Sequence, residues 1–383
     1  MAMPIAIQGY CDPRFSKVKE AFQKNFDSGL EVGASVAVTV DGKFVVDLWG
    51  GYADAARTRP WKQDTIANVY STTKVMTALC ALMLIDRGQL DLDAPVARYW
   101  PEFAQNGKEK MPVRYLLSHQ AGLAGFEAAI TDDTLYDWGR ATSLLAAQKP
   151  WWEPGTASGY HGITMGYLVG EVVRRITGKT LGTFFREEVA IPLNADFYIG
   201  LPEKYDRRVA ELIPAPALKP GDPGYAAPDP DSIRGRSMKS LNPNQANETA
   251  WRRAEIPAAN GHGNAHSVAR VGAALACGGE LDGVRLLKLA TIEKALEEQC
   301  DGTDLVLGDH IRWGLGVELN IKERPHSPNP RTFSWGGAGG SIIVVDLDAK
   351  LSWSYVMNRC SQGAHFKDQR NRAIAQALNA IMY

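Results

Sequence analysis

The sequence predicts an α/β protein of the α+β type, with one mostly antiparallel sheet that is built from both ends of the chain. Strand-like runs lie at 32–54 near the N-terminus and at 313–358 near the C-terminus, and helical patterns occupy the middle. A chain of 383 residues suits one large domain or two interlocked ones. The most economical architecture is therefore a sheet flanked by helices, with an inserted, mainly helical region.

Two units follow from this pattern. We expect residues 1–80 and 250–383 to form the α/β sheet domain, residues 81–249 to form the helical domain, and the active site to lie between them. Residues 213–232 are dense in proline and glycine, which predicts a long irregular loop inside the helical region. A loop of that length in a compact chain is usually functional or mobile.

The N-terminal elements follow from local patterns. Apolar residues recur every three to four positions from Phe15 to Phe26, which predicts an amphipathic helix over 14–27. Two β-rich runs flank Asp41-Gly42, a strong signal for a hairpin. The stretch from Ser71 to Arg87 is apolar around most of its circumference, so a buried helix is expected there.

The remaining elements are expected in the middle and at the C-terminal end. Helical patterns alternate with loops from about 90 to 200, and further helices are predicted at 265–277 and from about Gln369. Strand-like runs are WGLGVELN (313–320), GSIIVVDLD (340–348) and LSWSYVMN (351–358).

The composition excludes several classes of function. The formal net charge is −1, so no strong field attracts nucleic acid or an anionic membrane, and no apolar run is long enough to span a bilayer. The five cysteines are widely spaced and give neither a disulfide framework nor a CxxC metal pair. The N-terminus has no basic residue before Arg14 and is a poor secretory signal. A reduced, cytoplasmic protein is the simplest interpretation, and the mature form of a secreted protein is the alternative.

Ser71 and Lys74 form a Ser-x-x-Lys motif at the start of the buried helix. The motif alone is weak evidence, because Ser16 and Lys19 repeat it on what we expect to be a solvated helix face. At a helix start the free N–H groups favour negative charge on the hydroxyl, and a lysine three residues later shares its face. A desolvated lysine has a lowered pKa and can act as a base. The alternative is an N-capping serine with a lysine that reaches solvent.

Two later segments offer the other groups that acyl transfer needs. Tyr160 directly precedes a helix, and its phenol could handle a proton beside a lysine, although a buried ring with a satisfied hydroxyl is the commoner case. The run from Phe333 to Ser341 contains four glycines beside a strand. Backbone N–H groups there could form an oxyanion hole with that of the serine. The alternative is an ordinary glycine-rich turn.

Taken in order, Ser71-Thr72-Thr73-Lys74, Tyr160 and Trp335-Gly336-Gly337 resemble the motifs of the serine β-lactamase and penicillin-binding-protein superfamily, and the match is nearest to its esterase branch, the family VIII carboxylesterases. The resemblance covers nearly the whole chain. Supporting stretches are LLSHQAGL (116–123), PGTASGYHGITMGYLVGEVVRRITG (154–178), IPAANGHGNAHSVARVGAALACGGELDGVRLL (256–287), RWGLGVEL (312–319) and WGGAGGS (335–341). It implies a β-lactamase-like fold.

The resemblance also implies a role for each matching residue. Ser71 becomes the nucleophile, and Lys74 and Tyr160 become the base pair that takes its proton and later activates water. Which of the two is the kinetic base is disputed across the superfamily. The strand wall of the site would be Trp335, Gly336 and Gly337. The oxyanion hole would be formed by the main-chain N–H groups of Ser71 and Ala338.

This chain departs from the β-lactamase pattern at two positions. The tyrosine motif ends in Gly162 where asparagine is usual, and the strand motif begins with Trp335 where lysine is usual. Loss of a cation and gain of an indole make a pocket better suited to neutral apolar acyl groups than to anions. Two interpretations are open for Trp151 and Trp152, a place in the same wall or a place in the core, of which the core is the commoner case. No acidic residue is recognisable as a dedicated deacylation base.

Other catalytic and metal sites lack support. A Ser-His-Asp hydrolase would need a G-x-S-x-G elbow, which is absent, and His119 lies within the LLSHQAGL segment as a structural histidine. His262 and His266 are four residues apart, as zinc ligands on a helix can be, but Gly261 and Gly263 break a helix there. We therefore expect no metal, no cofactor and no phosphate loop.

The predicted function is a serine carboxylesterase that hydrolyses small-molecule, short-chain carboxylic esters through an acyl-enzyme on Ser71. A β-lactamase, a D-peptidase or amidase, and an acyltransferase share this chemistry and remain open. A protein of another class, a sensor that is acylated without turnover, is the remaining alternative.

Overall fold

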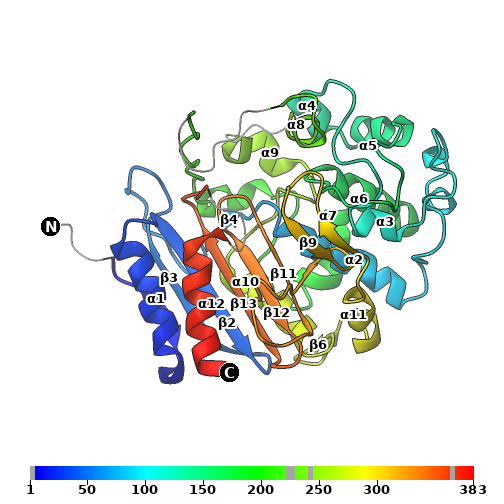
Figure 1. The fold of residues 1–383 in the computed structure, drawn as a ribbon. Coiled ribbons are helices and arrows are strands. Elements are labelled where there is room, and N and C mark those ends of the chain that lie inside the picture. The colour runs from blue at the N-terminus through cyan, green and yellow to red at the C-terminus, as the bar shows by residue number, and fades with distance from the viewer. Residues whose placement is uncertain (1–4, 221–228, 240–244, 363–366) are drawn as a thin grey trace.

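The computed structural model describes residues 5–220, 229–239, 245–362 and 367–383. Within these residues, a nine-stranded, wholly antiparallel sheet runs through the molecule (Figure 1). Its strands, in spatial order, are β1 (Gln8–Cys11), β3 (Lys43–Gly51), β2 (Gly33–Val40), β13 (Leu351–Met357), β12 (Ile342–Asp346), β11 (Thr332–Gly336), β10 (Glu318–Leu319), β9 (His310–Trp313) and β8 (Cys300–Thr303). Both ends of the chain therefore build one sheet, and the predicted fold class is confirmed.

The hairpin predicted at Asp41-Gly42 joins β2 to β3. Both turn residues have positive φ, 47° at Asp41 and 75° at Gly42, the combination that a tight hairpin turn requires. On its other side β2 pairs with β13, so that Val40 lies opposite Leu351. The junction between the N-terminal and C-terminal parts of the sheet thus lies between these two strands.

Helices α1 (Ser16–Asp27) and α12 (Gln369–Met382) lie side by side on one face of the sheet (Figure 1). Alternate residues of the central strands face them, because successive side chains of a strand point to opposite faces. The cluster under the two helices includes Phe22 from α1, Ile374 from α12 and Trp353 from β13. The predicted N-terminal and C-terminal helices are both confirmed.

The opposite face of the sheet packs against α10 (Ala265–Ala276), and the remaining helices lie above and to the right of the sheet in the view of Figure 1. Helix α2 (Thr73–Asp86) is buried along nearly its whole length, as its uniformly apolar sequence predicts. The other helices of four or more residues in the described chain are α3 (Arg114–Leu117), α4 (Asp132–Tyr136), α5 (Trp138–Ala147), α6 (Thr164–Thr177), α7 (Leu181–Phe185), the π-helix Arg186–Ala190, the 3₁₀ helix Glu203–Arg208, α8 (Ile233–Met238), α9 (Thr249–Arg253) and α11 (Leu289–Ala295).

Several predictions differ from the structure in detail. The run 313–320 is not one strand, because β9 ends at Trp313 and β10 contains only Glu318 and Leu319. A left-handed Gly316 (φ 78°) interrupts it. The loop predicted at 213–232 lies partly outside the described residues, at 221–228. One hydrophobic cluster runs through the sheet and the helices of 81–249, and the division into two units stays a prediction.

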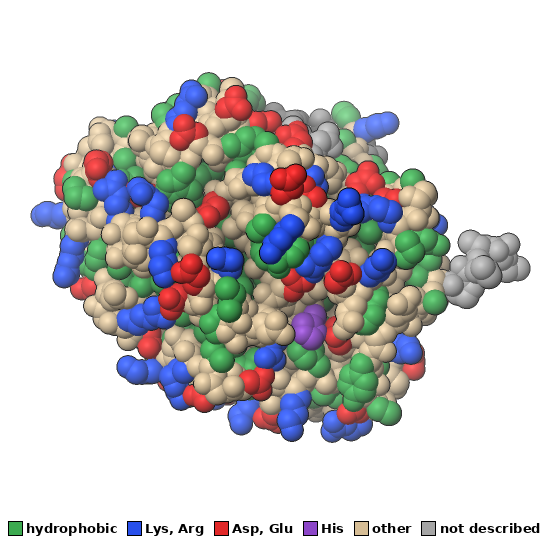
Figure 2. All heavy atoms as spheres, turned by 180° about the vertical axis from the view of Figure 1, so that it is seen from behind, with side chains coloured by type: hydrophobic (Ala, Val, Ile, Leu, Met, Phe, Trp, Pro, Cys, Tyr) green, Lys and Arg blue, Asp and Glu red, His purple; other side chains and the backbone are tan. Residues whose placement is uncertain are grey.

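The surface matches the nearly neutral composition. Figure 2 shows lysine and arginine side chains interspersed with aspartate and glutamate over one face. No helix in the described part of the chain has the length and apolarity to cross a membrane.

Candidate active site

Ser71 lies in a tight turn at the N-terminal end of α2. The preceding residue, Tyr70, has a positive φ of 42°, an uncommon conformation for a bulky side chain. The helix itself begins at Thr73, two residues later than the sequence predicts, so Ser71 precedes the N-cap, Thr72. The Ser71 side chain is half-buried, whereas Thr72 and Thr73 are fully buried. The turn therefore presents the serine hydroxyl at the end of a rigid, buried helix.

Lys74 is enclosed by its neighbours and is only 1% exposed. Its Nζ lies 3.2 Å from Ser71 Oγ, 2.6 Å from the carbonyl oxygen of Gly162 and 2.9 Å from that of Ala258. Burial lowers the pKa of Lys74 well below its usual value, because the charged amine loses its hydration. No carboxylate is among the causes of this shift.

Tyr160 completes the group around the serine. Its hydroxyl oxygen lies 2.6 Å from Ser71 Oγ, and Lys74 Nζ lies 4.7 Å from the centre of its ring. Burial raises the pKa of Tyr160 above its usual value, although hydrogen bonds with the side chains of Ser71 and Trp335 act in the opposite direction. The structure thus brings together Ser71, Lys74 and Tyr160, from segments almost ninety residues apart.

The main chain of Tyr160 is fixed by a residue that the sequence did not single out. Asp304 lies in the connection between β8 and β9 and is fully buried. Its Oδ1 accepts hydrogen bonds from the N–H groups of Tyr160, Val306 and Leu307, at 2.9, 2.9 and 3.0 Å. One carboxylate oxygen therefore ties the tyrosine segment to the edge of the sheet.

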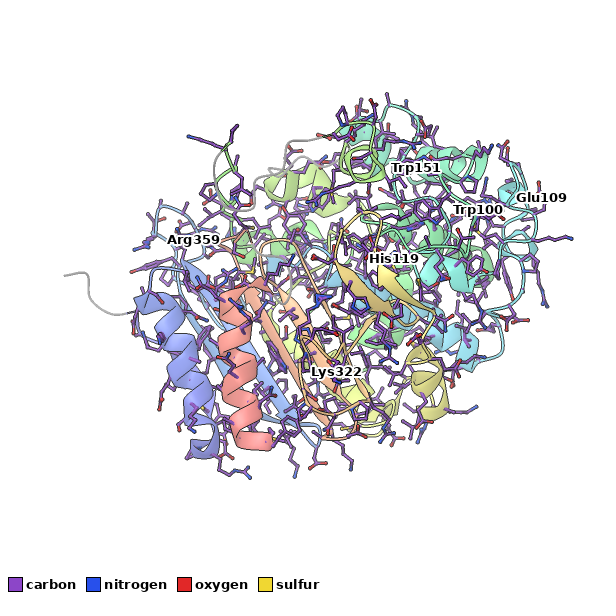
Figure 3. All side chains as sticks on the ribbon, in the orientation of Figure 1. Trp100, Glu109, His119, Trp151, Lys322 and Arg359 are labelled. Atoms are coloured by element: carbon purple, nitrogen blue, oxygen red, sulfur yellow. The ribbon has the colours of Figure 1, made fainter. Side chains whose placement is uncertain are left out.

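Aromatic rings surround the Tyr160 ring. Trp313 stacks on it in a nearly parallel orientation, with ring centres 6.3 Å apart, and Trp335 packs against both. His119, labelled near β9 in Figure 3, contacts Tyr160 edge-on, with ring centres 5.1 Å apart. Its Nδ1 accepts the main-chain N–H of His161, and burial lowers the pKa of both imidazoles. His119 is thus buried among aromatic rings, in agreement with the structural role that the sequence predicts for it.

The turn between β11 and β12 packs directly against the Ser71 turn. The Oγ of Ser341 donates to the carbonyl oxygen of Val69 at 2.7 Å and lies 3.0 Å from Thr72 Oγ1. A Cβ at Gly337 would lie 2.1 Å from the same Val69 oxygen, so only glycine fits there.

The residues predicted for the strand wall and the oxyanion hole lie on this hairpin. Trp335 and Gly336 end β11, and the Trp335 side chain is 1% exposed and packed behind Tyr160. Ala338 is exposed in the turn. Within the described residues, neither its N–H nor that of Ser71 donates a hydrogen bond. Their assignment to an oxyanion hole stays a prediction.

The remaining candidates lie elsewhere. His262 Nδ1 contacts the carbonyl oxygen of Asn260, and His266 contacts Asp47 and stacks on Phe44, so the two imidazoles do not share a partner. No set of three or more His, Cys, Asp or Glu side chains in the described residues is arranged to hold a metal ion.

The paired tryptophans are half-buried. Trp151 lies under the guanidinium of Arg236 and donates to Glu127, whereas the Nε1 of Trp152 donates to the carbonyl oxygen of Ala157. Both line a cavity of about 840 Å³. Their place in the substrate wall stays a prediction.

Comparisons with known proteins agree with this geometry. The sequence profile of the beta-lactamase family matches residues 22–379. The chain is 37% identical over 365 residues to "Esterase/beta-lactamase LipL" of Mycobacterium tuberculosis, which covers 92% of this chain and 82% of that protein. A family VIII carboxylesterase structure is 43% identical, covers 98% of this chain and 100% of its own, and superposes with a TM-score of 0.92. A penicillin-binding protein homologue from Caulobacter crescentus is 40% identical, with the same coverage and TM-score.

The motifs at Ser71, Tyr160 and Trp335 therefore identified the superfamily correctly. The relatives, two of them named as esterases, show that the chain is a serine hydrolase, and the chain belongs to the beta-lactamase family.

Proposed function

We propose that this protein is a serine carboxylesterase that hydrolyses short-chain, neutral carboxylic esters through an acyl-enzyme on Ser71. The observation that carries the proposal is the continuous chain from Tyr160 OH through Ser71 Oγ to Lys74 Nζ, with separations of 2.6 and 3.2 Å. A nucleophile with two proton-handling groups in hydrogen-bond reach is the arrangement that covalent catalysis requires.

The surroundings of Lys74 favour it as the group that takes the Ser71 proton. A neutral amine has two N–H bonds and one lone pair. The carbonyl oxygens of Gly162 and Ala258 accept the two N–H bonds, and this leaves the lone pair for the serine hydroxyl. Burial lowers the pKa of Lys74, which makes the neutral amine accessible well below the ordinary lysine pKa.

Tyr160 is assigned the opposite role. Burial raises its pKa, so the phenol stays protonated and can donate to the leaving oxygen. Ser71 Oγ bonds to the ester carbon as Lys74 takes its proton, and the carbonyl electrons move to the oxygen. When the intermediate collapses, the C–O bond to the alcohol breaks and the leaving oxygen takes the proton of Tyr160. The Lys74 ammonium then reprotonates the phenolate. In the second half of the reaction water attacks the acyl carbon as Lys74 takes its proton, the bond to Ser71 Oγ breaks, Ser71 takes the proton of Tyr160, and Lys74 again reprotonates the phenolate.

The oxyanion is assigned to the main-chain N–H groups of Ser71 and Ala338. The first belongs to the nucleophile turn, and the second to the turn that Ser341 ties to Val69. Donors held in this way stabilise charge that develops only in the transition state, without reorganisation during the reaction.

The proposed substrate class rests on the residues near Ser71, Lys74 and Tyr160. Trp335 replaces the usual cation of the strand motif, and it contributes an indole that packs on Tyr160 and Trp313. A site without that cation favours neutral esters over carboxylate-bearing substrates. One relative is named as both an esterase and a beta-lactamase, so β-lactam hydrolysis is the second candidate. Amidase, D-peptidase and acyltransferase activities use the same chemistry.

The test is the reaction with a short-chain nitrophenyl ester. We expect steady release of nitrophenol, with a transient acyl group on Ser71 detected by mass spectrometry after acid quench. Ser71→Ala should lose nitrophenol release and the acyl group while it keeps the fold. The control is Ser16→Ala, in the exposed second copy of the motif, which should retain both properties. Hydrolysis that persists in Ser71→Ala would refute the assignment. A stable adduct without turnover would instead indicate an acylated sensor.

A substrate panel separates the candidate activities. Nitrophenyl esters of rising chain length, a chromogenic cephalosporin and a competing alcohol are compared by kcat/KM. We expect the short esters to be preferred and the cephalosporin to be a poor substrate. A cephalosporin that matches the best ester would favour a β-lactamase, and transfer to the alcohol in excess of hydrolysis would favour an acyltransferase.

A further inference from the structure

The turn that carries Ala338 is also held by the first residues of α12. The guanidinium of Arg370 donates through Nη2 to the carbonyl oxygen of Gly339, and Asn371 Nδ2 donates to that of Gly340 at 2.9 Å. The N–H of Ser361 also donates to Gly339, at 3.0 Å. Both of these carbonyl groups closely follow the proposed oxyanion donor, so the peptide planes after it have fixed partners.

Arg370 is itself immobilised. It is 2% exposed, and its Nη1 donates to the carbonyl oxygen of Arg359 at 2.8 Å and to Glu31 Oε1 at 2.9 Å. Its Nε donates to Asp368 Oδ1 at 2.9 Å. Figure 3 labels Arg359 near the N-terminal end of α12. Because a guanidinium is planar and rigid, these partners fix the position of the nitrogen that reaches Gly339.

The carboxyl groups around Arg370 keep its guanidinium protonated. Burial disfavours its cation, but Glu31 and Asp368 together keep the pKa of Arg370 above its usual value. A buried guanidinium with two carboxylate partners stays charged at all working pH values, and hydrogen bonds from a charged donor are stronger than neutral ones.

The turn does not determine its own conformation. Gly339 and Gly340 have φ of 87° and 124°, and glycine is permissive over this whole region. A Cβ at Gly340 would lie 2.3 Å from Arg370 Nη2 and 2.4 Å from Asp368 Oδ2, so the side chains of α12 fill the space behind the turn. A flexible sequence is thus held by contacts from another element.

Two sets of contacts therefore hold the turn that carries Ala338. Ser341 ties the turn to the nucleophile turn through Val69, and Arg370 and Asn371 tie it to α12. We propose that Arg370, assisted by Asn371, is a positioning residue that directs the Ala338 N–H at the reacting carbonyl oxygen. The proposal rests on the esterase function above and adds a buried element of the C-terminal helix to it.

The test uses Arg370→Lys, which keeps a positive charge beside Glu31 and Asp368 but cannot reproduce the planar set of donors. Asn371→Asp, nearly the same shape, places an acceptor against the Gly340 oxygen. Arg372→Lys on the exposed face of the same helix is the matched control. Each variant is checked for folding by circular dichroism and assayed with a nitrophenyl ester. The acyl-enzyme from nitrophenyl trimethylacetate, labelled with ¹³C at the carbonyl, is examined by difference infrared spectroscopy.

We expect Arg370→Lys to lower kcat by about tenfold to a hundredfold, with KM changed less than about twofold, because a misplaced donor costs the charged oxyanion of the transition state more than it costs the neutral carbonyl of the bound ester. The acyl carbonyl stretch should move to higher wavenumber as its hydrogen bond weakens. Asn371→Asp should change kcat and the carbonyl stretch in the same directions, and Arg372→Lys should change neither quantity.

Unchanged kcat and carbonyl stretch in a folded variant would overturn the proposal, as would a lower kcat without a carbonyl shift. If neither variant folds, the network determines folding rather than positioning, and the proposal is also overturned. A wild-type protein that forms no adduct on Ser71 would refute the esterase function itself, which distinguishes the two failures.

Discussion

At the scale of single residues, burial separates two copies of one motif. Ser16 and Lys19 are exposed on α1, whereas Lys74 is 1% exposed and its amine contacts Ser71 and two carbonyl oxygens. The spacing of serine and lysine is the same in both copies. The chemistry differs because only Lys74 loses its hydration. The apolar residues beside Lys74 in the sequence indicate that it is buried, but they do not give the contacts of its amine.

The lowered pKa of Lys74 predicts the pH dependence of ester hydrolysis. The neutral amine is the active form, so kcat/KM should rise with pH through the pKa of Lys74 and reach its plateau well below the ordinary lysine value of about 10.5. Lys74→Arg cannot release its proton and should be roughly a hundredfold or more slower over this range. A pH–rate profile measures both. A rising limb near the ordinary lysine pKa would contradict the assignment of Lys74 as the base.

At the scale of elements, the hairpin of β8 and β9 holds the main chain of Tyr160, a role that its sequence does not predict. These strands have four residues each, and β8 (CDGT) lacks the apolar alternation that marks a half-buried strand. Asp304 lies in the connection between the two strands and looks in sequence like an ordinary loop aspartate. Its function depends on contacts with Tyr160, which is 144 positions away. Local pattern therefore predicted the long helices and central strands, and missed the short strands and this anchor.

Asp304 should be needed to hold Tyr160. Asp304→Ala leaves the buried N–H groups of Tyr160, Val306 and Leu307 without their acceptor, and we expect a loss of about 3 kcal/mol or more in the free energy of unfolding. Asp304→Asn keeps an oxygen acceptor at the same place and should recover most of the stability and kcat. Urea unfolding measures the stability of the two variants, and steady-state kinetics measures their kcat. Equal stability of the alanine variant and wild type would refute this role.

At the scale of the whole molecule, a buried charged group links the first and last helices. Glu31 follows α1, and its Oε1 accepts hydrogen bonds from Arg370 of α12 and from Tyr355 of β13. The motif-bearing residues of the site could be predicted from sequence because each lies in a short local motif that resembles one of a known family. This network could not, because Glu31 and Arg370 stand 339 positions apart and each looks like an ordinary charged residue beside an amphipathic helix.

Glu31 should make stability depend on pH. Burial raises its pKa from 4.5 to about 7 despite the opposing charge of Arg370, and Asp368 and Tyr355 are the other ionisable groups that face it. Between these pH values the native state holds more protons than the unfolded state, so stability falls as pH rises from about 4.5 to about 7 and is level above it. This contribution is on the order of 3 kcal/mol.

Urea unfolding from pH 5 to pH 8 measures the effect. Glu31→Gln removes the titrating group and should show a smaller fall in the free energy of unfolding over this range than wild type. Glu20→Gln, at an exposed position of α1, is the control and should behave as wild type. A fall of the same size in Glu31→Gln and wild type would show that another group is responsible.

The junction between β2 and β13 has a consequence for biosynthesis. Val40 pairs with Leu351, which the ribosome adds 311 residues later. At about 5–20 residues per second, the interval is roughly 15–60 s. During this interval β2 has no partner strand on the side that later pairs with β13. Such an unpaired edge is a template for association with other chains. Protection of the β2 edge until β13 has been synthesised should therefore raise the yield of folded protein.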